Sequence, residues 1–247
     1  MSTIKEDFEL PSKGMIYTRK FDPHFVLRSM TTEDEMARLA PSQNPYKAMS
    51  DIIESCLEKK FPIPVYDLCL GDYTYLLHKL RVVTYGADYN LRFTCPYCGK
   101  SETITINLDD MPVNRYDESL EDMSTVVLPV SKNEIKLRFQ TPRDLDRIAN
   151  EAKKMREEFP DMVGDPTILL TLQSLIDLID GSAVNPIMIK ETLKKLPMKD
   201  TNTISKIATK LNSSIGIDTD LKITCSNCGG EVNTPFRYTS EFFGPSV

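Results

Sequence analysis

Apolar residues recur at helical spacing along much of the chain. After Asn44 and Pro45, which are typical of a helix start, the apolar positions fall on one face of a helix: Met49, Ile52, Ile53, Cys56 and Leu57. The same spacing predicts further helices over residues 72–83, 165–180, 186–196 and 203–211. Helices with one apolar face pack against a shared core, so the pattern indicates a globular protein rich in helices.

Polar residues mark where several helices start and stop. Thr32 is the predicted N-cap of a short helix that reaches Ala40, with Glu35 as the second member of a capping box. Thr141 is the predicted N-cap of a later helix, and Pro142 is its first helical residue. Gly181 is the predicted stop of the helix over residues 165–180.

Strand-like stretches accompany these helices. Residues 25–29 form a short predicted strand, and residues 89–94 and 102–108 form a pair of strands with a turn between them. A similar pair lies near the end of the chain, with its second strand over residues 230–238. The mixture of helices and strand pairs predicts an α+β fold.

Each strand pair is joined by a Cys-x-x-Cys-Gly turn. The first turn holds Cys95 and Cys98, and the second holds Cys225 and Cys228. A strand that leads into such a turn is typical of a zinc knuckle, where two thiolates converge on one metal ion, and two knuckles complete a tetrahedral site. We therefore expect one structural Zn²⁺ per chain, held in a zinc ribbon built from both knuckles.

Other interpretations of these cysteines remain open at this stage. A redox-active Cys-x-x-Cys usually opens a helix, whose N-terminus lowers the thiol pKa, whereas each pair here follows a strand-like run. The two pairs could also be unrelated, and iron in a rubredoxin-like site would use the same four thiolates. A structural Cys₄ site keeps no open position, so we expect no catalysis at this metal. Cys56 and Cys69 are expected in the core.

Similarity between distant segments indicates a divergent duplication. Residues 86–95 align with residues 216–225 at an offset of 130 positions, and residues 27–40 resemble residues 137–149. The predicted organisation is an extended N-terminal arm (1–20), a first half ending in one knuckle (21–110), an acidic linker (111–124), a second half ending in the other knuckle (125–238) and an aromatic tail (239–247). The metal would then join two related halves.

Composition disfavours several functional classes. The 247 residues include 30 basic and 36 acidic residues, and the net charge of −6 argues against non-specific binding to nucleic acid. The longest apolar stretch, residues 168–179, is interrupted by polar residues and is too short to cross a membrane. The first twenty residues hold three acidic residues and no apolar signal segment. We expect neither membrane nor nucleic acid as a partner.

No pattern in the sequence supports an enzyme. The two histidines, His24 and His78, are 54 positions apart, and no phosphate-binding glycine loop or nucleophile elbow is present. We expect no catalytic activity and no small-molecule substrate.

The two ends of the chain carry aromatic and apolar residues whose role the sequence leaves open. Phe8, Leu10 and Pro11 lie in the N-terminal arm, and Phe242 and Phe243 lie in the tail. Chain ends are often disordered unless they are docked. These residues are therefore candidates either for the chain's own core or for docking to a partner protein.

Several short motifs together resemble a known family. They are Leu10-Pro-Ser-Lys-Gly14, Leu27-Arg-Ser-Met-Thr31, Arg81-Val-Val-Thr-Tyr-Gly86, Cys95-Pro-Tyr-Cys-Gly99 and Phe242-Phe-Gly-Pro-Ser246. They are similar to motifs of the baseplate hub proteins of T-even-type contractile-tailed bacteriophages, which are hub subunits or hub assembly proteins. The resemblance implies a non-enzymatic component that meets other hub, spike, tube or tape-measure proteins. It implies the host cell cytoplasm during assembly as the location, with the virion tail baseplate as a second location.

The sequence therefore predicts two related α+β halves joined by a Cys₄ zinc ribbon, acting as a protein-interaction scaffold in a phage baseplate hub. Two alternatives belong to other classes: a zinc-ribbon adaptor of a nucleic-acid machine and a Cys-x-x-Cys redox protein. The adaptor would need a basic face near the knuckles, for which Arg92, Lys100, Lys222 and Arg237 are the local candidates.

Overall fold

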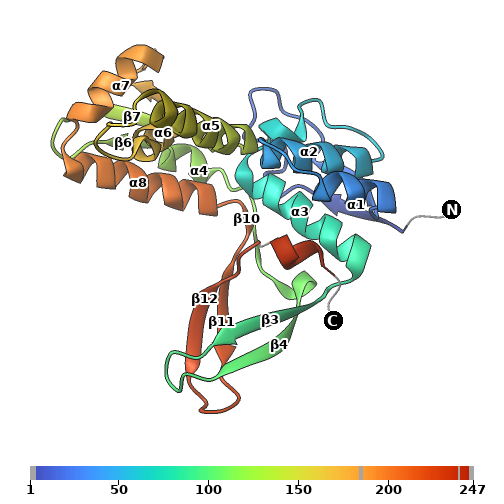
Figure 1. Ribbon diagram of the computed structural model, residues 1–247. Coiled ribbons are helices and arrows are strands. Elements are labelled where there is room, and N and C mark those ends of the chain that lie inside the picture. Colours follow the sequence, from blue (N-terminus) through green and yellow to red (C-terminus); the bar gives the residue numbers. More distant parts are fainter. Residues whose placement is uncertain (1–3, 184–185, 239, 245–247) are drawn as a thin grey trace.

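The computed structural model describes residues 4–183, 186–238 and 240–244, and it mixes helices and strands as predicted (Figure 1). Residues 4–110, here called the first half, begin with a hairpin and three helices and end in a second hairpin. Their elements are β1 (Lys5–Glu9), β2 (His24–Arg28), α1 (Thr32–Leu39), α2 (Pro45–Cys56), the 3₁₀ turn η1 (Val65–Asp67), α3 (Leu70–Tyr85), β3 (Asp88–Thr94), β4 (Ser101–Asn107) and η2 (Leu108–Asp110).

Residues 125–238, here called the second half, contain a small sheet, four helices and a last hairpin. Their elements are β6 (Thr125–Val127), β7 (Glu134–Leu137), α5 (Pro142–Glu158), α6 (Pro166–Leu175), β8 (Ile176–Ile179), β9 (Ser182–Ala183), α7 (Pro186–Lys195), α8 (Met198–Ser213), β10 (Gly216–Ile217), β11 (Asp220–Thr224) and β12 (Glu231–Pro235). Strands β6 to β9 form one antiparallel sheet in sequential order. The chain ends with η3 (Ser240–Phe243).

The segment 111–124 between the halves is anchored at several points. It carries β5 (Val113–Asn114), which pairs with β10, and α4 (Ser119–Met123). Met111 and Leu120 are buried within it. This acidic segment is therefore attached to the rest of the molecule through β5 and two buried apolar residues.

Each half has its own hydrophobic core. In the first half, Leu27, Ile53, Leu76 and Leu80 are fully buried, and Phe236 and Phe242 from the end of the chain join this core. The core of the second half forms between the small sheet and α6, α7 and α8. The described helices include none with both the length and the hydropathy that a membrane crossing requires.

The two halves meet in a contact that we call the inter-half joint, formed by α5 against α2 and η1 and by the start of α3. Leu70 donates its N–H to the carbonyl oxygen of Gln140 at 2.8 Å, and Arg143 pairs with Asp67 at 2.5 Å. A Cβ added to Gly71 would lie 2.2 Å from the carbonyl oxygen of Ile215, so the two backbones touch there. The joint is therefore closely packed.

Asp146 of α5 binds the start of α2 across the inter-half joint. Its carboxylate accepts the N–H groups of Tyr46 at 3.4 Å and Lys47 at 2.9 Å, as well as the hydroxyl of Tyr66. The predicted cap residue of α2, Asn44, makes no capping bond and instead accepts a hydrogen bond from Asn150. The second half thus caps a helix of the first half.

Three predicted helix boundaries are wrong. The N-cap of α1 is Thr31, with Asp34 rather than Glu35 as its capping-box partner, because Asp34 is also held by Arg28 at 2.7 Å. The predicted helix 165–180 ends at Leu175, and residues 176–179 form β8, which pairs with β7. The predicted helix 203–211 is longer and begins at Met198.

His78 gives the fold a predicted dependence on pH. It is fully buried, its Nε2 lies 2.8 Å from the carbonyl oxygen of Leu108, and burial lowers its pKa to about 4. The unfolded chain binds a proton at His78 below its ordinary pKa of about 6.5, whereas the folded chain does not. The stabilisation is therefore complete above that pH and is lost as the pH falls toward 4.

We expect this histidine to account for a loss of about 2–3 kcal/mol in the free energy of unfolding between pH 7 and pH 4.5. Urea unfolding at both pH values, compared with the non-titrating variant His78→Gln, measures it, since all other groups titrate alike in both proteins. An equal loss in the variant would contradict the assignment.

Candidate metal centre

Two hairpins of the same construction carry the four knuckle cysteines. Strands β3 and β4 pair up to Thr94 and Ser101, and β11 and β12 pair up to Thr224 and Glu231. In each turn the carbonyl oxygen of the first cysteine accepts the N–H of the glycine four residues later at 2.9 Å. Gly99 and Gly229 have φ values of 72° and 71°, a region that favours glycine. The turn chemistry of the sequence therefore produces both knuckles.

The hairpins bring all four thiols together. The Sγ atoms of Cys95, Cys98, Cys225 and Cys228 all lie within 4.8 Å of one another. Across the two hairpins, Cys95 lies 3.7 Å from Cys228 and Cys98 lies 3.8 Å from Cys225. A tetrahedral ion with Zn–S distances of about 2.3 Å separates its sulfur atoms by about 3.8 Å. The geometry and the donor set therefore fit a four-coordinate metal ion, which these four cysteines would hold.

Further contacts cross between the hairpins around the thiols. Ser226 donates its backbone N–H to the carboxylate of Glu102 at 3.1 Å, and Lys100 Nζ donates to the side-chain oxygen of Asn227 at 2.6 Å. Both contacts are exposed, so each contributes little stability by itself. A small cluster around Cys95, Cys225 and Val232 provides the buried contacts at this end of the molecule.

The protein environment shifts the pKa values of two of the thiols in opposite directions. The backbone N–H of Lys100 lowers the pKa of Cys98 to about 7, which favours the thiolate that binds metal. The hydrogen bond to Glu102 raises the pKa of Cys225 to about 12. Because metal ligation requires deprotonated thiols, binding at this site releases protons.

The geometry disfavours the two alternative functions. Both Cys-x-x-Cys pairs lie in hairpin turns, whereas redox-active pairs usually lie at the start of a helix, whose N-terminus lowers the thiol pKa. The basic candidates for a nucleic-acid face alternate with acids, because Arg92 and Lys100 share their hairpin with Asp88 and Glu102.

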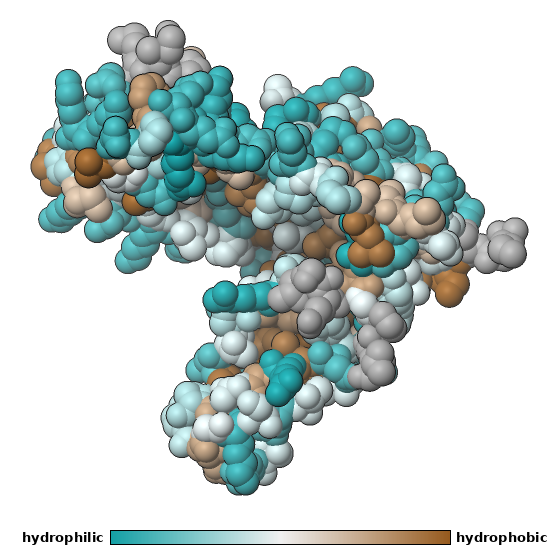
Figure 2. All heavy atoms as spheres, in the orientation of Figure 1, coloured by the Kyte–Doolittle hydropathy of each residue, from teal (hydrophilic) through white to brown (hydrophobic). Residues whose placement is uncertain are grey.

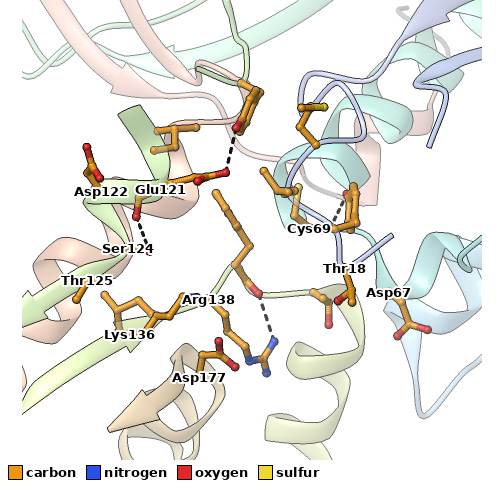
Figure 3. Close-up of a pocket in the computed structure, with 18 residues that line it drawn as sticks. Thr18, Asp67, Cys69, Glu121, Asp122, Ser124, Thr125, Lys136, Arg138 and Asp177 are labelled. Carbon is orange, nitrogen blue, oxygen red and sulfur yellow. Dashed lines mark hydrogen bonds between the residues drawn. The ribbon is translucent and has the colours of Figure 1, made fainter. Parts of the chain in front are cut away.

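A cavity with a volume of about 780 Å³ lies between the halves (Figure 3). Its labelled residues include Cys69 from the first half and Arg138 from the second. Burial raises the pKa of the Cys69 thiol well above its ordinary value, and Arg138 is paired with Asp144 at 2.8 Å. Cys69 is therefore held as the neutral thiol, and the charge of Arg138 is taken up by its ion pair.

The candidate docking residues at the chain ends pack mostly inside the molecule. Leu10 and Pro11 are buried, and Phe8 stacks on Phe25 with ring centroids 5.7 Å apart. Phe242 and Phe243 are 1% and 5% exposed. Leu10, Phe242 and Phe243 therefore belong to the core of the first half.

Three networks that sequence reasoning missed also hold the fold together. Asp72, buried at the start of α3, accepts hydrogen bonds from Ser12 and Tyr17. Asp200, buried at the start of α8, accepts the backbone N–H groups of Val130 and Ser131. Asp146 forms the third network, in the inter-half joint. The signal for the first two was an aspartate in the first turn of a helix, which predicts capping but not its distant donors.

The comparisons with known proteins agree with the family resemblance. No curated protein and no solved structure matches the chain. The model of one family, described as T4 bacteriophage base plate protein, matches residues 1–244. This match covers both hairpins and both halves, and it indicates a structural protein of the virion tail that meets other baseplate or tail proteins. The chain belongs to the T4 bacteriophage base plate protein family.

Proposed function

We propose that the chain is a structural or assembly component of the baseplate hub, in which one Zn²⁺ locks two related halves into a rigid scaffold for other tail proteins. The observation that carries the proposal is the convergence of two hairpins, 130 positions apart in sequence, on one site with four thiols. The role is non-enzymatic, since a closed Cys₄ site has no position for a substrate.

The same local side-chain contacts occur in both halves, which supports the duplication. Arg28 pairs with Asp34, the capping-box partner of Thr31, and Arg138 pairs in the same way with Asp144, the partner of Thr141. Asp72 accepts the N–H of Ser12 at 2.9 Å, and Asp200 accepts the N–H of Val130 at 2.9 Å. In each half, both contacts lie before the hairpin that carries the knuckle. The metal would then connect the equivalent ends of two copies of one unit.

A metal at this position would act as a long-range clamp. Closing a long loop costs only logarithmically more entropy than closing a short one. The binding free energy of structural zinc is about 10–16 kcal/mol in small fingers, comparable to the stability of a whole domain. A single ion can therefore fix the orientation of both hairpins, although their direct contacts are few and mostly exposed.

Co-purification from the native source tests the function. We expect a tagged chain to retain proteins of the hub, spike, tube or tape measure, and to contain about one zinc per chain. A chain that instead retains nucleic-acid enzymes would support the adaptor alternative. Iron in place of zinc would keep the scaffold function but change the metal.

A further inference from the structure

Two exposed apolar surfaces at opposite ends of the molecule take no part in the metal centre. One is the outer face of α1, where Met36 and Leu39 are 70% and 66% exposed. The other is the start of α8, where Met198 and the neighbouring Val130 are 68% and 49% exposed. Figure 1 places these two surfaces at opposite ends of the paired halves, and Figure 2 shows hydrophobic residues reaching the surface at both. They cannot meet within one chain.

The start of α8 is built like the start of α3, which lies in the inter-half joint. Leu70 and Met198 are the first residues of these helices, and each stands two positions before a buried aspartate, Asp72 or Asp200, that holds a preceding turn. Leu70 donates its N–H to Gln140 of the second half. Met198 occupies the equivalent position at the free end of the molecule.

The outer face of α1 is likewise equivalent to the face of α5 that forms the joint. Counted from the N-caps Thr31 and Thr141, the joint residues Arg143 and Asp146 correspond to Glu33 and Met36. Asp146 is 2% exposed because the first half covers it, whereas Met36 is 70% exposed. The face that α5 uses for a joint is therefore uncovered and apolar on α1.

The two free surfaces also differ in charge. Lys132, Lys195 and Lys199 are exposed around the start of α8. Asp200 is buried there and binds backbone N–H groups, and the exposed Asp180 nearby accepts hydrogen bonds from Asn133 and Glu134. The outer face of α1 carries the exposed Glu33 beside its apolar residues. A basic apolar surface and an acidic apolar surface are complementary, which favours their contact over contacts between like surfaces.

We propose that copies of this chain associate head to tail, with the start of α8 of one copy (Val130, Met198 and the three lysines) against the outer face of α1 (Glu33, Met36, Leu39) of the next. This inference goes beyond the proposed function, and it rests on the duplication of the two halves that is part of that proposal. A contact between two different surfaces leaves one of each free at the ends, so the assembly closes as a ring or continues as a filament.

Sedimentation velocity of the full-length, metal-loaded chain over a range of concentrations tests the contact. Met36→Asp blocks one surface and Met198→Asp blocks the other, so each variant alone is expected to stay monomeric. An equimolar mixture still contains one intact pair of surfaces, and it is expected to form dimers but nothing larger. Wild-type protein is expected to form larger species, which decrease as salt is raised.

The controls separate this contact from other causes. Val163 is fully exposed elsewhere, so Val163→Asp should associate like the wild type. Lys199→Glu should weaken association, and mixing it with Glu33→Lys should restore part of it. All of these positions are exposed, so stability and metal content should not change, and a failure here is distinct from a failure of the metal clamp.

Two results would overturn the proposal. Wild-type protein that stays monomeric at every concentration would mean that the two surfaces do not bind each other. A dimer formed by Met36→Asp alone would mean that self-association uses another surface.

Discussion

Cys225→Ser is expected to lower the free energy of unfolding by at least about 3 kcal/mol, because the binding free energy of structural zinc contributes directly to folding. The substitution removes one of four thiolates that lie within 4.8 Å of one another. Since Cys225 faces Cys98 of the other hairpin at 3.8 Å, the loss should loosen β3–β4 as well as β11–β12. Cys98→Ser should have the same effect on both hairpins.

Three measurements check this result together. Metal analysis should give about one zinc per wild-type chain and much less in the variant. Urea unfolding gives the stability, and hydrogen exchange shows which hairpin opens. Cys56→Ala is the matched control, because Cys56 is buried in the core of the first half and lies outside the group of four. It should retain the metal even if it lowers stability. Protection lost in β11–β12 alone would argue against a clamp.

Each Cys-x-x-Cys knuckle could be predicted from the sequence because its geometry is local. Two strands, a Cys-x-x-Cys turn and a glycine at positive φ determine each knuckle within about ten residues. The convergence of the two knuckles is not local, and the sequence predicts it only through the four ligands that a tetrahedral metal requires. The structure brings the thiols to the required spacing, which supports that inference.

The end of α6 shows where helical periodicity misleads. Ile176 and Ile179 continue the apolar spacing of the helix, yet they belong to β8 and pair with Leu137 and Ile135 of β7. Asp180 and Gly181 have φ values of 48° and 72° and form the hairpin turn that leads to β9. The dipeptide Asp-Gly is a strong hairpin signal, which could have corrected the prediction.

The inter-half joint could not be predicted because its residues are polar and far apart in sequence. Asp146 appears in the sequence as an exposed position on a charged helix, but it is 2% exposed and binds the start of α2. Its donors lie about a hundred positions earlier. Only the tertiary fold makes this aspartate the cap of a helix in the other half.

The position of the aromatic tail could not be predicted either. A phenylalanine pair near a chain end has the same sequence signature in a core and in an interface. In the structure, the ring of Phe242 lies 4.9 Å from that of Tyr238 and 5.7 Å from that of Tyr89, measured between centroids. The fully buried Arg81 donates its Nε–H to the carbonyl oxygen of Phe242 at 2.8 Å. The tail thereby connects the last hairpin to α3.

Phe242→Ala is therefore expected to lower the free energy of unfolding by about 3–5 kcal/mol, as for other phenylalanines removed from a packed core. The change leaves a cavity beside the buried His78, whose ring centroid lies 6.1 Å from that of Phe242. Urea unfolding monitored by circular dichroism measures the loss.

Phe159→Ala is the matched control, since the same side chain is removed from a position that is 59% exposed. Its effect should stay within about 0.5 kcal/mol. A docking role for the tail makes the opposite prediction: Phe242→Ala would leave the stability of the isolated chain unchanged and would reduce only its retention of tail proteins. Because the two roles differ in the isolated protein, one unfolding experiment distinguishes a tail that completes the core from a tail that is offered to a partner.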